Sequence, residues 1–228
     1  MIVYGKQICN HLINRHPELI KEIYLSKTID KKSFAALKRL NKSILKIDAK
    51  KAQSMAKGGN HQGWLCDTLP YKYSTINDVK GGKFLVALDG LTDVGNIGAI
   101  IRSAYAFGAD GVIVGGLKQL PSEAVVRTSS GAMFDIPVAL EKSLADSLNQ
   151  LRLAGFTIYG ADTSGVCLED VVFKEKRVLV MGSEGSGLSK KLKKLIDEMV
   201  TIRMSRPFDS LNVSVAAGII MYRMGHGG

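Results

Sequence analysis

Uninterrupted apolar segments recur in the last two thirds of the chain, and they constrain its fold more than any other feature. Three of them lie at Phe84–Asp89, Gly111–Gly115 and Arg177–Met181. A strand that is covered on both faces of a parallel sheet has such a sequence, because neither face meets water. Segments with helical spacing separate these runs, and strands that alternate with helices favour an α/β fold.

The other elements of this part are predicted from shorter patterns. A loop over 90–97 precedes a helix over 98–107, whose core face holds Ile100, Ile101, Ala104 and Phe107. Further strands are expected at 136–140, 156–160 and 200–204, and helices at 142–153, 188–196 and 211–224.

The first 70 residues combine short helices and strands in a separate pattern. We expect a helix and then a strand over 4–25, a helix over 33–40, a strand over 43–47, a helix over 49–57 and a strand ending at Cys66. Residues 68–82 show no clear period and contain Pro70 and two adjacent glycines, as linkers do. The sequence therefore predicts an N-terminal α/β domain over 1–73, a linker over 74–82 and a second domain over 83–228.

Positive charge is concentrated at the N-terminal end. The 228-residue chain has a net charge of +10, and residues 1–73 hold 14 Lys and Arg against 5 Asp and Glu. Nearly all of the excess therefore lies on the first third. A basic module joined to a near-neutral one suggests an anchor for a polyanion. A solubilising lysine surface is the alternative.

Cysteines and histidines give no sign of a disulfide framework or a metal site. Cys9, Cys66 and Cys167 are odd in number and lack CxxC spacing, and the four histidines are scattered. We therefore expect no metal. No apolar run approaches the roughly 18 residues of a membrane span, and the first residues lack a signal-peptide pattern. We expect a cytoplasmic protein without a membrane partner.

The loop and helix after the first buried strand hold two candidate site residues, Asn96 and Arg102. The glycines at Gly90, Gly95 and Gly98 lack the GxGxxG spacing, which argues against a dinucleotide-binding turn. A helix N-cap is the structural alternative for Asn96. A surface cation with a packed stem is the alternative for Arg102.

A glycine-rich turn follows the strand Arg177–Met181. Its sequence from Gly182 to Gly187 is Gly-Ser-Glu-Gly-Ser-Gly, and glycines let a ligand approach backbone amides. No Gly-Lys-Ser/Thr follows, so the turn favours an uncharged or zwitterionic ligand over a nucleotide phosphate. A strand-to-helix turn with Ser189 as N-cap is the alternative.

A polar segment opens the last apolar helix. Ser210, Asn212 and Ser214 come together where backbone N–H groups at a helix start are free to bind. Ser210 as a simple N-cap is the alternative, but three polar groups are more than a cap needs.

Together these segments resemble the SpoU (TrmH-type) family of RNA ribose 2′-O-methyltransferases, which belong to the SPOUT class. Asn96 with Arg102 matches the first family motif, and Gly182-x-Glu184-Gly-x-Gly matches the second. The third motif matches residues 210–217 (Ser-Leu-Asn-Val-Ser-Val-Ala-Ala). All three stand in the family's order and spacing.

The resemblance covers nearly the whole chain. Residues 128–132 (Thr-Ser-Ser-Gly-Ala) are similar to a family segment between the first two motifs. Residues 4–6 (Tyr-Gly-Lys) and 61–63 (His-Gln-Gly) resemble the substrate-binding domain of the subgroup that includes the 23S rRNA guanosine 2′-O-methyltransferase.

The resemblance implies a particular fold and assembly. The expected fold is a C-terminal SPOUT domain with a mostly parallel sheet and a deep trefoil knot. A small α/β RNA-binding domain that resembles a ribosomal protein would precede it. The expected assembly is a homodimer packed through the catalytic domains.

It also implies the site. S-adenosylmethionine would bind near Gly182, Ile202 and Leu211, and no metal would be required. Arg102 would lie at the target ribose and its phosphate, either polarising the hydroxyl or acting as its base. Four polar residues complete the expected catalytic set: Asn96, Glu184, Ser210 and Asn212.

One segment departs from the family pattern. The family's usual Ile-Pro-Met-x-Gly before the third motif is here Ile202-Arg-Met-Ser-Arg206. The two added cations, Arg203 and Arg206, fit contact with phosphate. Salt bridges to Asp209 or Asp197 are the alternative.

The predicted function is S-adenosylmethionine-dependent 2′-O-methylation of a ribose in RNA, with a guanosine of 23S rRNA as the expected target. The basic module favours rRNA, because the tRNA enzymes of the family usually carry shorter extensions. A tRNA methyltransferase of the same fold and an RNA-binding or assembly protein with a degenerate site are the alternatives. The missing GxGxxG argues against a nicotinamide oxidoreductase.

Overall fold

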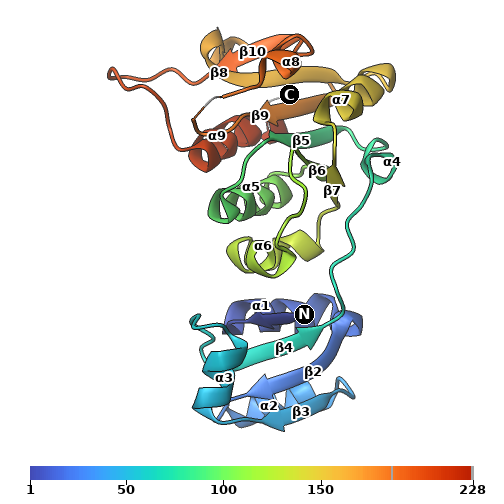
Figure 1. Cartoon of the computed structure of the whole chain (residues 1–228), viewed down its shortest axis with the longest axis vertical. Coiled ribbons are helices and arrows are strands. Elements are labelled where there is room, and N and C mark those ends of the chain that lie inside the picture. The colour runs from blue at the N-terminus through green and yellow to red at the C-terminus, as the bar shows by residue number, and fades with distance from the viewer. Residues whose placement is uncertain (186, 227–228) are drawn as a thin grey trace.

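Six parallel strands form the larger of two sheets in the computed structural model, which describes residues 1–185 and 187–226 (Figure 1). Their spatial order is β10-β8-β9-β5-β6-β7, and every neighbouring pair is parallel. The strands are β5 (Phe84–Asp89), β6 (Gly111–Gly115), β7 (Val138–Glu141), β8 (Thr157–Cys167), β9 (Arg177–Met181) and β10 (Glu198–Thr201). The predicted α/β fold with a mostly parallel sheet is confirmed.

Helices cover both faces of this sheet. In β5, Val86 and Leu88 point into one core, whereas Leu85 and Ala87 point into the other, because successive side chains of a strand face opposite sides. On the first face lie α5 (Val94–Ala106), α6 (Ser122–Thr128) and α9 (Val213–His226) (Figure 1). On the second lie α4 (Ile76–Val79), α7 (Leu144–Leu153) and α8 (Lys190–Lys193).

The N-terminal residues form a second, mixed sheet of four strands in the order β1-β4-β2-β3. Its strands are β1 (Ile2–Tyr4), β2 (Ile20–Leu25), β3 (Ser43–Lys46) and β4 (Trp64–Thr68). Its helices are α1 (Lys6–Arg15), α2 (Lys31–Lys38) and α3 (Ala49–Met55). Helix α1 lies between this sheet and the α6 region of the larger unit (Figure 1), and its Ile8, Cys9 and Leu12 belong to the core that both units share.

Several predicted boundaries are wrong. Helix α5 starts at Val94 instead of residue 98, because Asp93 caps it by accepting a hydrogen bond from the Asn96 amide at 2.7 Å. The expected helix over 188–196 is reduced to α8. Strand β10 ends at Thr201, so Ile202 and Met204 lie in the following loop.

The sequence patterns also missed short elements, among them β1, α4 and α6. Helix α4 lies inside residues 68–82, and Thr75 and Asp78 form a capping box at its start. That signature was present in the sequence. No helix among the described residues has the length and apolarity needed to cross a bilayer.

Candidate functional site

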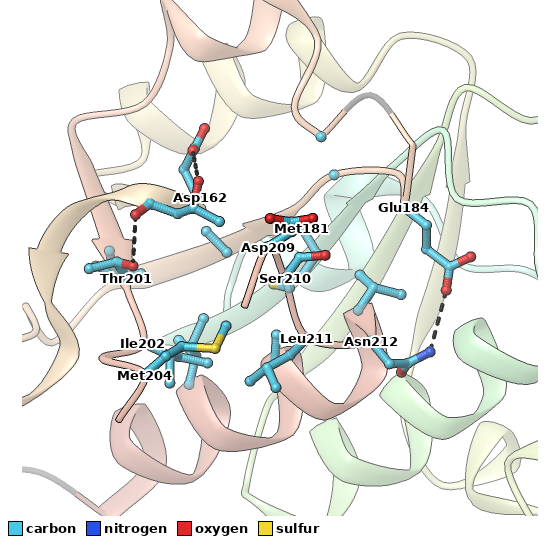
Figure 2. A pocket seen from close by; sticks show the side chains of 18 of the residues that line it. Asp162, Met181, Glu184, Thr201, Ile202, Met204, Asp209, Ser210, Leu211 and Asn212 are labelled. Atoms are coloured by element: carbon cyan, nitrogen blue, oxygen red, sulfur yellow. Dashed lines mark hydrogen bonds between the residues drawn. The ribbon is translucent and has the colours of Figure 1, made fainter. Parts of the chain in front are cut away.

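A cavity of about 770 Å³ lies where β9 and β10 end and α9 begins (Figure 2). Its size falls within the roughly 300–1,000 Å³ that small-molecule sites occupy. All three residues expected to hold the cofactor line it: Gly182, Ile202 and Leu211. Three of the expected catalytic residues also line it: Glu184, Ser210 and Asn212.

One side of this cavity is lined by Gly182, Ser183, Glu184 and Gly187. Ser183 and Gly187 exchange two backbone hydrogen bonds, at 2.9 and 3.2 Å, so the loop folds back on its own start. A Cβ added to Gly182 would lie 2.2 Å from the Gly187 carbonyl carbon and 2.4 Å from the Leu188 nitrogen. Only glycine fits at position 182, because the backbone of Gly187 and Leu188 passes too close for a side chain. This requirement holds whether or not a ligand binds. Ser186, within the predicted motif, lies outside the described residues.

Three polar side chains from distant parts of the chain meet at the edge of the cavity. Asn96 donates from Nδ2 to the Glu184 carboxylate, and Asn212 donates from Nδ2 to Asn96 Oδ1 at 3.1 Å. Asn212 Nδ2 also lies 3.4 Å from Glu184 Oε1 (Figure 2). The structure thus brings together one residue of each predicted motif.

Asn212 has a second role as the cap of α9. Its Oδ1 accepts hydrogen bonds from the Ser214 amide at 2.9 Å, the Val215 amide at 3.3 Å and the Ser214 hydroxyl at 2.6 Å. These amides belong to the free N–H groups at a helix start. The alternative that Ser210 is the N-cap is therefore wrong, and Ser210 instead lies exposed on the cavity wall. The N-cap alternative for Asn96 is also wrong, since Asp93 has that role.

Arg102 lies outside the described lining of the cavity. It follows Asn96 by six residues on α5, which corresponds to about 9 Å along the helix axis. Its side chain is exposed, and Nη1 donates to Ser130 Oγ at 3.3 Å. Ser130 belongs to the segment 128–132, so the structure joins that segment to the first motif. The structure therefore places the Arg102 guanidinium on the surface beside Ser130 and outside the cavity lining.

The opposite wall of the cavity contains paired charges. Lys193 Nζ lies 2.7 Å from Asp162 Oδ2, and this hydrogen bond lowers the pKa of the Asp162 carboxyl. A hydrogen bond with Cys167, supported by the negative charges of Glu169 and Asp170, raises the pKa of Arg203. Sequence reasoning missed Asp162 and Lys193, because residues 31 positions apart carry no pairing signal.

The alternative that the added arginines form salt bridges to Asp209 or Asp197 is wrong for Arg203. Arg203 Nη2 lies 3.9 Å from Asp170 Oδ2, and both side chains are about two-thirds exposed. Asp197 is instead paired with Arg152 at 3.1 Å. An exposed pair of this kind contributes little to stability. The positive charge of Arg203 stays accessible to solvent at the cavity wall.

Comparison with known proteins identifies the class. The family model described as "SpoU rRNA Methylase family" matches residues 83–222. The model described as "RNA 2′-O ribose methyltransferase substrate binding" matches residues 2–74. The chain belongs to the SpoU rRNA methylase family.

Curated relatives extend beyond this chain. An "Uncharacterized tRNA/rRNA methyltransferase" of Mycolicibacterium gilvum is 37% identical over 188 residues, which are 78% of this chain and 60% of that protein. One of Mycobacterium bovis is 40% identical over 169 residues, 71% of this chain and 52% of that protein. The chain thus spans between half and two thirds of the length of these relatives.

Solved structures resemble the chain over nearly its full length. The SpoU methyltransferase AviRb from Streptomyces viridochromogenes, solved in complex with AdoMet, has a TM-score of 0.81 and 26% identity, covering 99% of this chain and 89% of that one. An AdoMet-bound rRNA methyltransferase from Sinorhizobium meliloti has a TM-score of 0.79 and 26% identity, covering 100% and 88%.

Proposed function

We propose that the chain transfers the methyl group of S-adenosylmethionine to the 2′-hydroxyl of a ribose in RNA. The observation that carries this proposal is the cavity beside the Asn96–Glu184–Asn212 cluster, in a chain of the SpoU family. The AdoMet complexes of two structural relatives support the choice of methyl donor.

The residues around the cavity fit this donor. The volume is adequate, Ile202 and Leu211 supply apolar contact area, and the loop after Gly182 supplies backbone groups. When bound, the sulfonium supplies a methyl group that is already activated for attack. The chain's own task is to hold the loops that carry Gly182 and Leu211 at a fixed separation. The contacts among Asn96, Glu184 and Asn212 perform that task.

Arg102 is proposed to bind the RNA at the reacting ribose. A guanidinium keeps its positive charge at neutral pH and binds phosphate oxygens through two N–H groups. The hydrogen bond from its guanidinium to Ser130 Oγ orients the side chain. Binding the phosphate beside the ribose would align the 2′-oxygen with the methyl donor, and alignment supplies a large part of the rate. Ser210, exposed on the cavity wall, is proposed to contact the RNA or a second subunit.

We further propose that residues 1–73 form the RNA-binding domain, 74–82 the linker and 83–228 the catalytic domain with a deep trefoil knot. The charge excess of residues 1–73 and the substrate-binding model matched at 2–74 support the first assignment. Homodimerisation through the catalytic domains is supported by exposed apolar side chains along α9: Val215, Ile219 and Tyr222. We also propose a cytoplasmic location.

Ribosomal RNA, with a guanosine of 23S rRNA as target, is the favoured substrate. The structural relative described as an AdoMet-bound rRNA methyltransferase covers 100% of this chain. A structure described as a TrmH/SpoU tRNA modifying enzyme from A. aeolicus covers 66%, at a TM-score of 0.59 and 24% identity, which concerns the fold alone. The basic N-terminal unit, which the substrate-binding model matches at residues 2–74, supports rRNA over tRNA.

The direct test is methyl transfer from labelled S-adenosylmethionine to separate rRNA and tRNA pools. Digestion to nucleosides then distinguishes a 2′-O-methylated ribose from a methylated base. We expect labelled 2′-O-methylguanosine from the rRNA pool. Binding of S-adenosylmethionine without transfer to either pool would favour the degenerate RNA-binding protein.

A further inference from the structure

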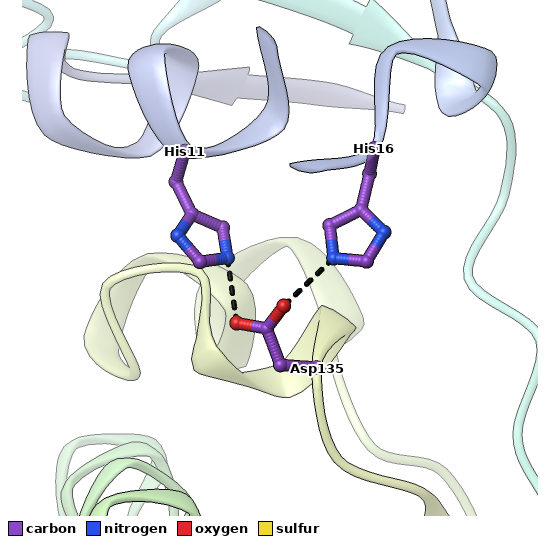
Figure 3. A group of neighbouring side chains, drawn as sticks. All are labelled: His11, His16 and Asp135. Atoms are coloured by element: carbon purple, nitrogen blue, oxygen red, sulfur yellow. Dashed lines mark hydrogen bonds and ion pairs between the residues drawn. The ribbon is translucent and has the colours of Figure 1, made fainter. Parts of the chain in front are cut away.

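Two histidines and one carboxylate meet where the N-terminal unit contacts the larger one (Figure 3). His11 lies in α1, His16 follows the end of that helix, and Asp135 follows the short helix Ala132–Phe134 on the facing side. His11 Nε2 is 2.7 Å from Asp135 Oδ2, and His16 Nε2 is 2.8 Å from Asp135 Oδ1. The sequence interpretation that the histidines are scattered is wrong for this pair, whose ring centroids are 5.9 Å apart.

The carboxylate is buried and only half satisfied by hydrogen bonds. The Asp135 side chain is 6% exposed, and the histidine side chains are about one-fifth exposed. His11 Nε2 and Asp135 Oδ2 are both shielded from solvent, and neither has a hydrogen bond of acceptable geometry within the described part of the chain. Asp135 Oδ1 has a hydrogen-bond partner in His16 Nε2, but a buried carboxylate that is satisfied on only one of its two oxygens is costly. The 2.7 Å between His11 Nε2 and Asp135 Oδ2 leaves no room for an ion on the line that joins them, but a cation bound beside that line could contact both.

The environment of His16 is compatible with the tautomer that a metal requires. Its Nδ1 faces Glu18 Oε1 at 3.6 Å. If a neutral His16 donated Nε2–H to Asp135, the Nδ1 lone pair would face the Glu18 carboxylate. Binding of a metal at Nε2 instead places the proton on Nδ1, where it points toward Glu18. Carboxylates commonly orient metal-binding histidines in this way.

We infer that His11, His16 and Asp135 form a binding site for a divalent transition-metal ion of the Zn²⁺ type, which fastens the N-terminal unit to the larger one. The three ligand atoms lie within 4.8 Å of one another. Two imidazoles and one carboxylate suit Zn²⁺ and leave a fourth position for water. This inference does not depend on the proposed methyl transfer.

One neighbouring cation must be considered. Arg15 NH1 lies 3.7 Å from Asp135 Oδ1, and its charge opposes a metal ion. The Arg15 side chain is 57% exposed, and NH1 donates to the Tyr105 hydroxyl at 2.8 Å. Its charge is therefore partly screened by water, and its position is fixed by Tyr105 and not by the carboxylate.

The site lies beside the turn that contacts Arg102. A Cβ added to Gly131 would lie 3.1 Å from His11 Cδ2, so this turn packs directly on the histidine ring. The preceding residue, Ser130, accepts the hydrogen bond of Arg102. A bound ion would thus fix the orientation of the basic N-terminal unit relative to Arg102.

The test uses the full chain, stripped with a chelator and titrated with Zn²⁺ by calorimetry and with Co²⁺ by visible absorption. We expect one equivalent of Zn²⁺, a Co²⁺ spectrum of low coordination number, and a higher melting temperature with Zn²⁺. Asp135→Asn and His11→Gln should abolish all three effects. Glu18→Gln should weaken Zn²⁺ binding about 10- to 100-fold, as loss of an orienting carboxylate does. His226→Gln, in α9, is the matched control and should bind normally.

Failure of the wild-type chain to bind one equivalent of Zn²⁺ would overturn the inference and leave a histidine–aspartate ion pair. Unchanged binding in Asp135→Asn would also overturn it. If Asp135→Asn does not fold, unchanged Zn²⁺ affinity in both His16→Gln and Glu18→Gln would contradict the site equally, because these side chains are more exposed.

Discussion

Asn212 donates a hydrogen bond from Nδ2 to Asn96 Oδ1 at 3.1 Å, although 116 positions separate the two residues. The contact joins the start of α9 to the first turn of α5. Asn96 in turn donates to Glu184 in the loop after β9. Because the Asn212 oxygen caps α9 while its nitrogen joins this cluster, one side chain couples helix stability to the geometry of the cavity.

Substitution of Asn212 tests this double role. Asn212→Ala removes both the cap and the cluster contact, so we expect the free energy of unfolding to fall by about 1–2 kcal/mol. Asn96→Ala removes the cluster contact and leaves the α9 cap intact. It should therefore lower the free energy of unfolding by less than Asn212→Ala does. Both variants should bind S-adenosylmethionine more weakly. Urea unfolding and calorimetry measure the two effects, and equal stability losses in both variants would argue against the capping role.

The loop after β9 offers a matched pair of glycine substitutions. In Gly182→Ala the new Cβ would overlap the backbone of Gly187 and Leu188, so the loop must open. We expect at least a tenfold loss of S-adenosylmethionine affinity. In Gly185→Ala the new Cβ meets no atom within 4 Å, so affinity should stay within about twofold. Similar affinities in the two variants would contradict the closed loop.

The Asp162–Lys193 pair predicts a pH dependence of stability. The hydrogen bond from Lys193 lowers the pKa of Asp162 in the folded chain, so the folded state binds fewer protons than the unfolded state. The stabilisation is therefore complete above the unfolded pKa, about 3.9, and disappears as the pH falls through the lower folded pKa. At neutral pH the free energy of unfolding of wild type should exceed that of Asp162→Asn by less than about 1 kcal/mol.

Urea unfolding of both proteins from neutral pH to about pH 3 measures this difference. It should shrink below about pH 4. A difference that grows with acidity would show that the carboxylate is not stabilised by its partner.

The parallel sheet could be predicted because its strands are buried on both faces. Phe84–Asp89 and Gly111–Gly115 have no polar face, and the predicted bounds agree with β5 and β6. The end of β10 was harder to predict. Ile202 and Met204 are apolar like strand residues, but they line the cavity instead of continuing the sheet.

The sequence motifs predicted which residues lie around the cavity. They did not predict which of these residues contact one another. Spacing alone left helix caps open as alternatives for Asn96 and Ser210, whereas Asp93 and Asn212 cap the helices. A local capping signal cannot distinguish between polar residues that lie two or three positions apart. The His11–Asp135 contact depends on how the two units pack, which no local pattern encodes.

The role proposed for Arg102 is tested most directly by Arg102→Ala, with S-adenosylmethionine binding and methyl transfer to RNA measured on the same preparation. The side chain lies outside the described cavity lining, so donor affinity should stay within about twofold of wild type. The rate of transfer should fall by about 10²- to 10³-fold or more, the effect of removing one charge-stabilising donor. Near-normal transfer by Arg102→Ala would contradict the account.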